Sequence, residues 1–197
     1  MSIVETPDVI VDTPQDRLRL AKDAARVTAR LTSGRKAEAL HAIADALLAH
    51  SDEIIAANAD DLARGEREGL GAGLLDRLRL DVRRVAGLAE AVRDIAALPD
   101  PVGEVVRGHR MPGGVNLEQV RVPFGVVGAI YEARPNVTVD IAALALRSGN
   151  AVVLRGGSAA LSSNTTLVAV MRDALEASGV SPDAIQSVDA FGRDGAK

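Results

Sequence analysis

The stretch RVPFGVVGAIYEARPNVTVDIAALALRSGNAVVLRGGS, residues 121–158, carries the pattern that decides the fold. Residues 126–131 are a continuous apolar run rich in β-branched side chains, which is typical of a parallel strand buried on both faces. Pro135 lacks a backbone donor and disfavours a helical conformation at the residue before it, so the strand has to end here. Ligands bind at the carboxyl ends of strands in open α/β sheets. The polar side chains gathered at this end are those of Glu132, Arg134 and Asn136.

The residues after this elbow repeat the alternation of strand and helix. They predict a helix over 137–148, a strand over 151–155, a helix over 163–178 and a short strand over 185–189. Right-handed connections between such elements build a parallel sheet with the order 3-2-1, which is one half of a doubly wound, Rossmann-like fold. We therefore predict the α/β class, with the second half of the sheet outside this sequence.

The first hundred residues predict helices instead. Helical spacing indicates helices over 16–31 and 35–50, a third with Ser51 as N-cap, a short fourth, and a fifth with Asp81 as N-cap. The expected buried face of the first helix consists of Leu20, Ala24, Val27 and Leu31. Residues 102–123 change to a period of two around MPGG, which predicts a β-hairpin. Its polar face suits either a solvent-facing ribbon or an intersubunit sheet.

The composition narrows the possible functions. The chain has 197 residues, of which 47% are hydrophobic, and a net charge of −4 with only three aromatic side chains, so a nucleic-acid partner is disfavoured. No apolar run is long enough to span a membrane and no leader pattern is visible, so we expect a cytoplasmic protein without a membrane partner. The histidines are scattered and the chain has no cysteine, so the sequence argues against a metal site.

The sequence of the central stretch resembles a known protein family. PFGVVGAIYEARPN followed by SGNAVVLRGGS is similar to the aldehyde dehydrogenase superfamily, and the elbow YEARPN followed by TVD resembles its γ-glutamyl phosphate reductase branch, also called glutamate-5-semialdehyde dehydrogenase. Other aldehyde dehydrogenases have a shorter, tryptophan-containing elbow and usually lysine at the position of Arg155. The resemblance is strongest over residues 101–158. Family members are considerably longer, so the chain resembles their N-terminal part.

The resemblance implies a division into domains. Residues 1–101 would form a helical segment that packs on the cofactor domain, residues 102–123 the hairpin of an oligomerisation arm, and residues 124–197 the first half of an NADP-binding domain. The domain with the catalytic cysteine would be absent. A full-length relative would be a homo-oligomer, with a possible functional partnership with glutamate 5-kinase.

The resemblance also implies a reaction, the NADPH-dependent reduction of L-glutamyl 5-phosphate to L-glutamate 5-semialdehyde and phosphate in proline biosynthesis. A thiolate displaces phosphate, and hydride transfer to the thioester gives a thiohemiacetal that collapses to the aldehyde. Because the chain has no cysteine, we predict that it is inactive alone, as a fragment or the product of an interrupted gene rather than an enzyme with a replaced nucleophile. The alternatives are an inactive nucleotide-binding or oligomerisation fragment and another acylating aldehyde dehydrogenase.

Three elbow residues are candidates for catalysis and substrate binding. By spacing alone, Asn136 is a helix N-cap, whereas the resemblance implies that its amide donates to the developing oxyanion. Arg134 and Glu132 form a local salt bridge in one interpretation. In the other, Arg134 binds an anionic part of the substrate, and Glu132 orients Arg134 or binds the substrate ammonium. Asp140 is expected to interact only with the helix dipole.

The candidate cofactor residues follow the second strand. Arg155 is a surface arginine by pattern alone, but the resemblance puts it at the adenosine ribose, where its fork geometry suits the 2′-phosphate of NADP. Gly156 and Gly157 allow a ligand to approach the backbone, although a simple turn explains them nearly as well, and Ser158 completes the predicted loop. No G-x-G-x-x-G motif follows the first strand, so the cofactor prediction rests on the resemblance.

Overall fold

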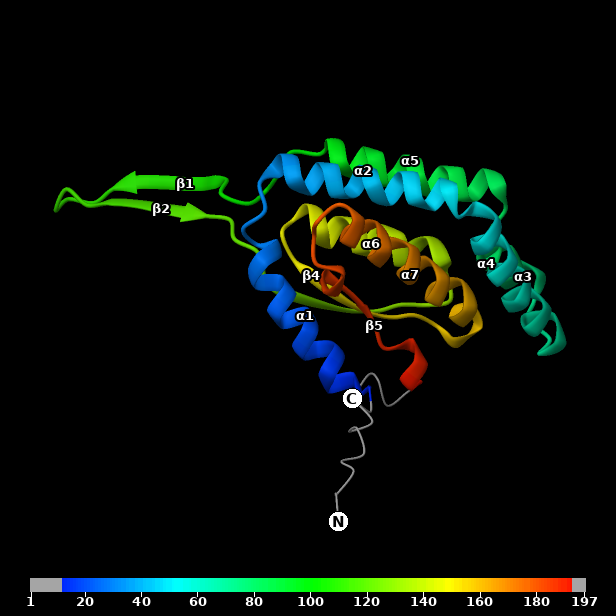
Figure 1. Ribbon diagram of the computed structural model, residues 1–197. Coiled ribbons are helices and arrows are strands. Elements are labelled where there is room, and N and C mark those ends of the chain that lie inside the picture. Colours follow the sequence, from blue (N-terminus) through cyan, green and yellow to red (C-terminus); the bar gives the residue numbers. More distant parts are fainter. Residues whose placement is uncertain (1–11, 193–197) are drawn as a thin grey trace, which may run out of the picture.

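The computed structural model describes residues 12–192 (Figure 1). Five helices come first: α1 (Pro14–Thr28), α2 (Ser33–Ala49), α3 (Ser51–Arg67), α4 (Ala72–Leu78) and α5 (Val82–Ala97). Strands β1 (Val105–Arg110) and β2 (Asn116–Val120) form the hairpin. The remaining elements are β3 (Val126–Ile130), α6 (Pro135–Arg147), β4 (Ala151–Arg155), η1 (Ser158–Ala160), α7 (Leu161–Ala177), η2 (Pro182–Ala184), β5 (Ile185–Ser187) and η3 (Asp189–Phe191).

The three later strands form the predicted parallel sheet in the order β3-β4-β5, which confirms the α/β fold class. The register pairs Val126 with Ala151 and Ile130 with Arg155. Helices α6 and α7 cover one face of the sheet and α1 covers the other, while α2 and α5 form an outer layer over α6 and α7 (Figure 1). Strand β4 therefore lies at the centre of the core, where all of its residues except the last are buried.

The predicted buried face of α1 is partly wrong. Leu20 and Val27 are 43% and 58% exposed. Ala24 is buried as predicted, and the other buried side chains of α1 are those of Ala21, Ala25 and Thr28. Three alanines on this face allow the helix backbone to lie close to the sheet, as contacts of α1 with β3, β4 and β5 show. The hydrophobic pattern alone favoured the larger side chains, but the close approach to the sheet selects the small ones.

The starts of the other helices mostly follow their capping residues. Asp81 caps α5 and accepts a hydrogen bond from the backbone N–H of Arg84 at 2.7 Å, as predicted. Ser51, in contrast, is not an N-cap but lies within α3. The backbone N–H of His50 donates to a carbonyl of α2, and the carbonyl of His50 accepts the N–H of Ile54 in α3. Because His50 terminates one helix and begins the next, no loop residue remains for Ser51 to be the cap.

A buried ion pair connects the outer helical layer to the start of the hairpin. Lys36 of α2 is 1% exposed, and its ammonium lies 2.6 Å from the carboxylate of Asp100. The guanidinium of Arg147, at the end of α6, donates to the carbonyls of Leu98 and Ser33 nearby. These contacts fix the end of α5 against α2 and α6, which positions the chain where it leaves for the hairpin.

The β1–β2 hairpin is antiparallel and projects away from the body of the molecule (Figure 1). Every residue of both strands is exposed. The predicted hairpin is therefore present, and its assignment to an oligomerisation arm stays a prediction. Among residues 12–192, no helix combines the length and apolarity needed to cross a membrane.

We expect the 197-residue chain to self-associate. Strand β3 is an edge strand of the described sheet. It exposes Ile130 (69%) at its end, and Phe124 (92%) is exposed just before the strand begins. An exposed apolar edge is a template for pairing with another chain. Light scattering should give a mean size that rises with protein concentration, and Ile130→Lys should reduce the rise because a charged edge opposes pairing. A constant monomeric size for the unmodified chain would contradict this expectation.

Candidate functional site

The elbow between β3 and α6 has an extended backbone that places its polar residues at the sheet edge. Arg134 is the N-cap residue with φ −135° and ψ 98°, and Pro135 is the first residue of the helix. Asn136 is therefore the second helical residue, and its predicted N-cap role is wrong. The fixed φ of proline suits the first helical position, so the helix begins two residues earlier than expected. The Asn136 side chain is exposed and does not cap the helix.

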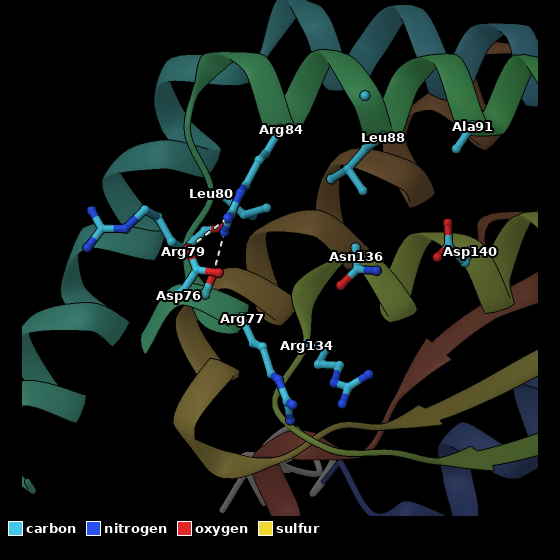
Figure 2. A pocket seen from close by; sticks show the side chains of 11 residues that line it. Asp76, Arg77, Arg79, Leu80, Arg84, Leu88, Ala91, Arg134, Asn136 and Asp140 are labelled. Carbon is cyan, nitrogen blue, oxygen red and sulfur yellow. Dashed lines mark hydrogen bonds and ion pairs between the residues drawn. The ribbon is translucent and has the colours of Figure 1, made fainter. Parts of the chain in front are cut away.

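A cavity of about 610 Å³ lies next to Asn136, between α6 and the α4–α5 region. Figure 2 shows Asn136 and Asp140 extending from α6 toward Leu88 and Ala91 of α5. Three arginines from outside α6, namely Arg77, Arg79 and Arg84, also line the cavity, together with Arg134. The cavity therefore joins the carboxyl edge of the sheet to a set of charged side chains.

Arg134 combines a loose ion pair with an unused donor. Its Nη2 lies 3.4 Å from a carboxylate oxygen of Glu132, and its buried Nε has no hydrogen-bond partner. A buried donor without a partner is costly, so Arg134 is suited to bind an anion. Glu132 is 76% exposed and does not line the cavity, so its contact with Arg134 agrees with an orienting role. The role of both residues toward the substrate stays a prediction.

Two of the other three arginines on the cavity, Arg84 and Arg77, differ in whether they are already paired. Arg84 donates to the Asp76 carboxylate at 2.8 Å and to the carbonyl of Arg79, so its charge is compensated within the protein. Arg77 forms none of the ion pairs found among residues 12–192. No sequence pattern indicated Arg77 as a site residue, because Arg77 belongs to the short helix α4, far from the elbow in the chain.

Asp140 lies in the second turn of α6, not in its first turn, so the expected dipole interaction is not supported. It lines the cavity one helical turn after Asn136. Burial raises the pKa of the Asp140 carboxyl, and a hydrogen bond from Asn136 partly opposes that shift in pKa. Its spacing of four residues from Asn136 is a signal that sequence reasoning missed, since such residues share one face of a helix.

The predicted cofactor loop begins at the end of β4, beside the elbow. The carbonyl of Arg155 accepts the N–H of Tyr131 at 3.1 Å, and the Arg155 side chain, which is partly buried, has no hydrogen-bond or ion-pair partner within residues 12–192. Ser158 is exposed at the start of η1. The unpaired guanidinium and the exposed hydroxyl at the carboxyl edge of the sheet fit a phosphate-bearing nucleotide.

Gly156 and Gly157 have a packing reason to be glycine. A Cβ at Gly157 would lie 2.6 Å from the backbone nitrogen of Ala133, and one at Gly156 would lie 2.2 Å from the amide nitrogen of Asn164. Gly157 thus allows the loop after β4 to contact the elbow closely, and Gly156 allows it to contact Asn164 of α7. Their predicted contact with the cofactor remains a prediction, supported only by the place of the loop.

We expect Gly157→Ala to destabilise the protein by about 1–3 kcal/mol, because the added methyl group has to displace elbow backbone. Chemical denaturation would measure this difference in the free energy of unfolding. Gly34→Ala is the matched control, since a Cβ there meets nothing within 4 Å in the first turn of α2. Equal stability of the two variants would contradict close packing between the loop and the elbow.

A chain of hydrogen bonds joins the elbow to this loop. The Tyr131 hydroxyl lies 2.8 Å from the Thr138 hydroxyl, which donates to Asn164 at 2.8 Å. The Asn164 amide and the N–H of Gly156 both donate to Asp189. Burial, partly opposed by the bond with Thr138, raises the pKa of Tyr131 to about 12, so the phenol is neutral at ordinary pH and donates to Thr138, whose one hydroxyl hydrogen goes to Asn164. The network fixes the two loops relative to each other.

Metal chemistry has no visible support in the described part of the chain. Within residues 12–192, no group of three or more histidine, cysteine, aspartate or glutamate side chains is arranged to hold a metal ion. The site is therefore described by its amide, its arginines and its carboxylates alone.

Comparisons with known proteins agree with this geometry. Residues 3–197 match the aldehyde dehydrogenase family. γ-Glutamyl phosphate reductases from Kineococcus radiotolerans and Clavibacter michiganensis are 62% and 63% identical over 90% and 93% of the chain, which covers only 41% and 43% of their lengths.

A solved structure is also similar to this chain over most of its length. γ-Glutamyl phosphate reductase from Thermotoga maritima has a TM-score of 0.89 and 36% identity over 93% of this chain and 44% of its own. The chain thus spans less than half the length of these relatives and corresponds to their N-terminal part. The match over nearly the whole sequence, together with the shared sheet and elbow, shows that the chain belongs to the aldehyde dehydrogenase family.

Proposed function

We propose that this chain forms the elbow and cofactor half of a γ-glutamyl phosphate reductase, which reduces L-glutamyl 5-phosphate to L-glutamate 5-semialdehyde with NADPH. The observation that carries the proposal is the position of Asn136, exposed at the start of α6 on a cavity that Arg134 also lines. An amide donor beside an anion-binding arginine suits an acyl phosphate. Homo-oligomer formation and a partnership with a glutamate 5-kinase belong to the same proposal.

The residues of this chain have separate tasks in that reaction. The Asn136 amide donates a hydrogen bond to the acyl oxygen as negative charge develops on it. Arg134, with Arg77 of α4, holds the phosphate group so that the acyl carbon faces the nucleophile. NADPH, when bound, supplies the hydride, and Arg155 and Ser158 would hold its adenosine phosphate. The nucleophilic cysteine has to come from outside this chain, which contains none.

A chimeric enzyme tests the proposal. In this chimera, the 197-residue chain replaces the matching part of the Clavibacter michiganensis relative, which supplies the remaining length. We expect the chimera to oxidise L-glutamate 5-semialdehyde in a reaction that requires both NADP and inorganic phosphate, and the chain alone to give no turnover.

Three outcomes would contradict the proposal. Turnover by the 197-residue chain alone, in proportion to its concentration, would mean that a nucleophile other than cysteine operates. A chimera that folds but accepts only coenzyme A in place of phosphate would favour another acylating aldehyde dehydrogenase. A folded chimera without any turnover would favour an inactive nucleotide-binding or oligomerisation fragment.

The cofactor preference gives a separate prediction. If Arg155 binds the 2′-phosphate, Arg155→Ala in the chimera should weaken NADP(H) binding by about 1–3 kcal/mol and leave NAD(H) binding nearly unchanged. Titrations of both cofactors, followed by nicotinamide fluorescence, measure the two dissociation constants. Arg107→Ala, an exposed arginine of the hairpin strand β1, is the matched control. Equal losses for both cofactors would exclude a phosphate-specific role of Arg155.

A further inference from the structure

The cavity beside the elbow is electrically asymmetric along α6. Arg134 lies just before the helix and Arg77 of α4 lines the same cavity, and neither has a charge-compensating contact closer than the 3.4 Å pair with Glu132. Asp140 lies on the same cavity one turn further along the helix, and none of the ion pairs among residues 12–192 includes it. Figure 2 shows the Asp140 carboxylate pointing away from these arginines, toward the α5 side of the cavity.

The spacing along α6 fits the length of an amino-acid side chain. Residues four apart on a helix have Cβ atoms ~5–6 Å apart, so Asn136 and Asp140 are neighbours on one face of α6, and both line the cavity. In glutamate derivatives, the γ-carbonyl carbon and the α-nitrogen are ~5 Å apart when the chain is extended, given ordinary bond lengths. A glutamate derivative that extends along α6 with its carbonyl oxygen at Asn136 is therefore long enough for its ammonium to reach Asp140, one turn further along.

We propose that Asp140 is the specificity residue that binds the α-ammonium group of an amino-acid substrate, in the cavity between α5 and α6. The inference rests on the proposed function, because it assumes that the reacting carbonyl lies at Asn136. An aspartate that is partly buried and lacks a cationic partner is costly to keep ionised, and a bound ammonium removes that cost. Leu88 and Ala91 form the apolar wall that excludes water from this contact.

The raised pKa of Asp140 agrees with this role. A carboxyl whose pKa is raised by burial is destabilising when it ionises, so the folded chain loses stability as the pH rises through that pKa. It keeps full stability below the unfolded value of 3.8. A cation in contact with the carboxylate lowers the pKa again, so substrate binding and ionisation of Asp140 favour each other.

The test compares two substrates of the chimera that differ only in the ammonium group. L-Glutamate 5-semialdehyde has it, and glutaric semialdehyde lacks it. The unmodified chimera should favour the amino substrate in kcat/KM, and Asp140→Asn should reduce this preference about tenfold or more, mainly through KM. Activity of Asp140→Asn on glutaric semialdehyde should persist, which shows that the variant is folded. The unmodified chimera and its Asp140→Asn variant encounter the same mixture of open and cyclic L-glutamate 5-semialdehyde, so ring closure of this substrate cancels in the comparison.

Two variants complete the test. Asp94→Asn removes an exposed carboxylate of α5 that does not line the cavity, and it should leave the substrate preference unchanged. An unchanged substrate preference in Asp140→Asn would overturn the assignment of Asp140, and so would a preference that is lost in Glu132→Gln rather than in Asp140→Asn. Either result would leave the proposed reductase activity intact. An unmodified chimera that oxidises neither substrate would instead contradict the proposed function itself.

Discussion

Replacing Asn136 by alanine is expected to lower kcat of the chimera by a factor of about 10² to 10³, which corresponds to about 2.7–4 kcal/mol of lost transition-state stabilisation. The reason is geometric. Asn136 lies in the first turn of α6, after a proline and an extended arginine that fix its backbone, and its side chain is exposed beside the cavity. An amide held in this way needs little reorganisation when the oxyanion forms.

Steady-state kinetics separates this role from general damage to the fold. KM should change much less than kcat, because the hydrogen bond is strongest in the transition state. Asn116→Ala, at an exposed asparagine of β2, provides the control and should leave kcat unchanged. A loss confined to KM, or a kcat within a few-fold of the unmodified chimera, would mean that Asn136 does not act on the developing charge.

Replacing Asp100 by alanine is expected to lower the free energy of unfolding by about 3–5 kcal/mol, because the Lys36 ammonium would remain charged and buried without its partner. Burial alone would raise the pKa of Asp100, but its hydrogen bonds with Lys36 and the N–H of Val102 hold that pKa below the usual value of 3.8. A depressed pKa of an acid contributes stability above the unfolded value, and this contribution is lost as the pH falls through the folded value.

Denaturant unfolding at neutral pH measures the effect, and two variants help to interpret it. Asp45→Ala removes the carboxylate that pairs with Arg93. Because this carboxylate is 74% exposed, its loss should lower the free energy of unfolding by less than about 1 kcal/mol. Lys36→Met in the Asp100→Ala background should recover much of the loss, since it removes the stranded charge. If Asp100→Ala and Asp45→Ala destabilise the chain equally, the ion pair at Lys36 is not buried in solution.

The features of the fold that depend on local pattern were predictable from the sequence. The apolar run before Tyr131 and the break at Pro135 gave the strand and the elbow, and the alternation after them gave the strand order. Errors arose where burial depends on a distant partner. The exposure of Val27 follows from how closely α1 approaches the sheet, and no periodicity within a helix contains that information.

The same distinction applies to the candidate site. Asn136 was visible because it follows a strand directly, but Arg77 was not, since only the tertiary fold brings α4 to the cavity. Asp140 had a signal in its spacing from Asn136, which becomes meaningful once the neighbouring cavity is known. The two glycines after β4 were assigned to a turn or a ligand, whereas the structure gives them an additional reason, close packing on the elbow.

The position of a bound substrate in a crystal structure of the chimera is the most direct test of the central claim, that the elbow and its cavity hold the acyl group of a glutamyl substrate. With L-glutamate 5-semialdehyde bound, we expect its aldehyde oxygen to lie at about 2.7–3.1 Å from the Asn136 amide nitrogen. The carbon chain should extend along α6 toward Asp140. A substrate bound outside this cavity, or an Asn136 amide directed away from the aldehyde oxygen, would contradict the account.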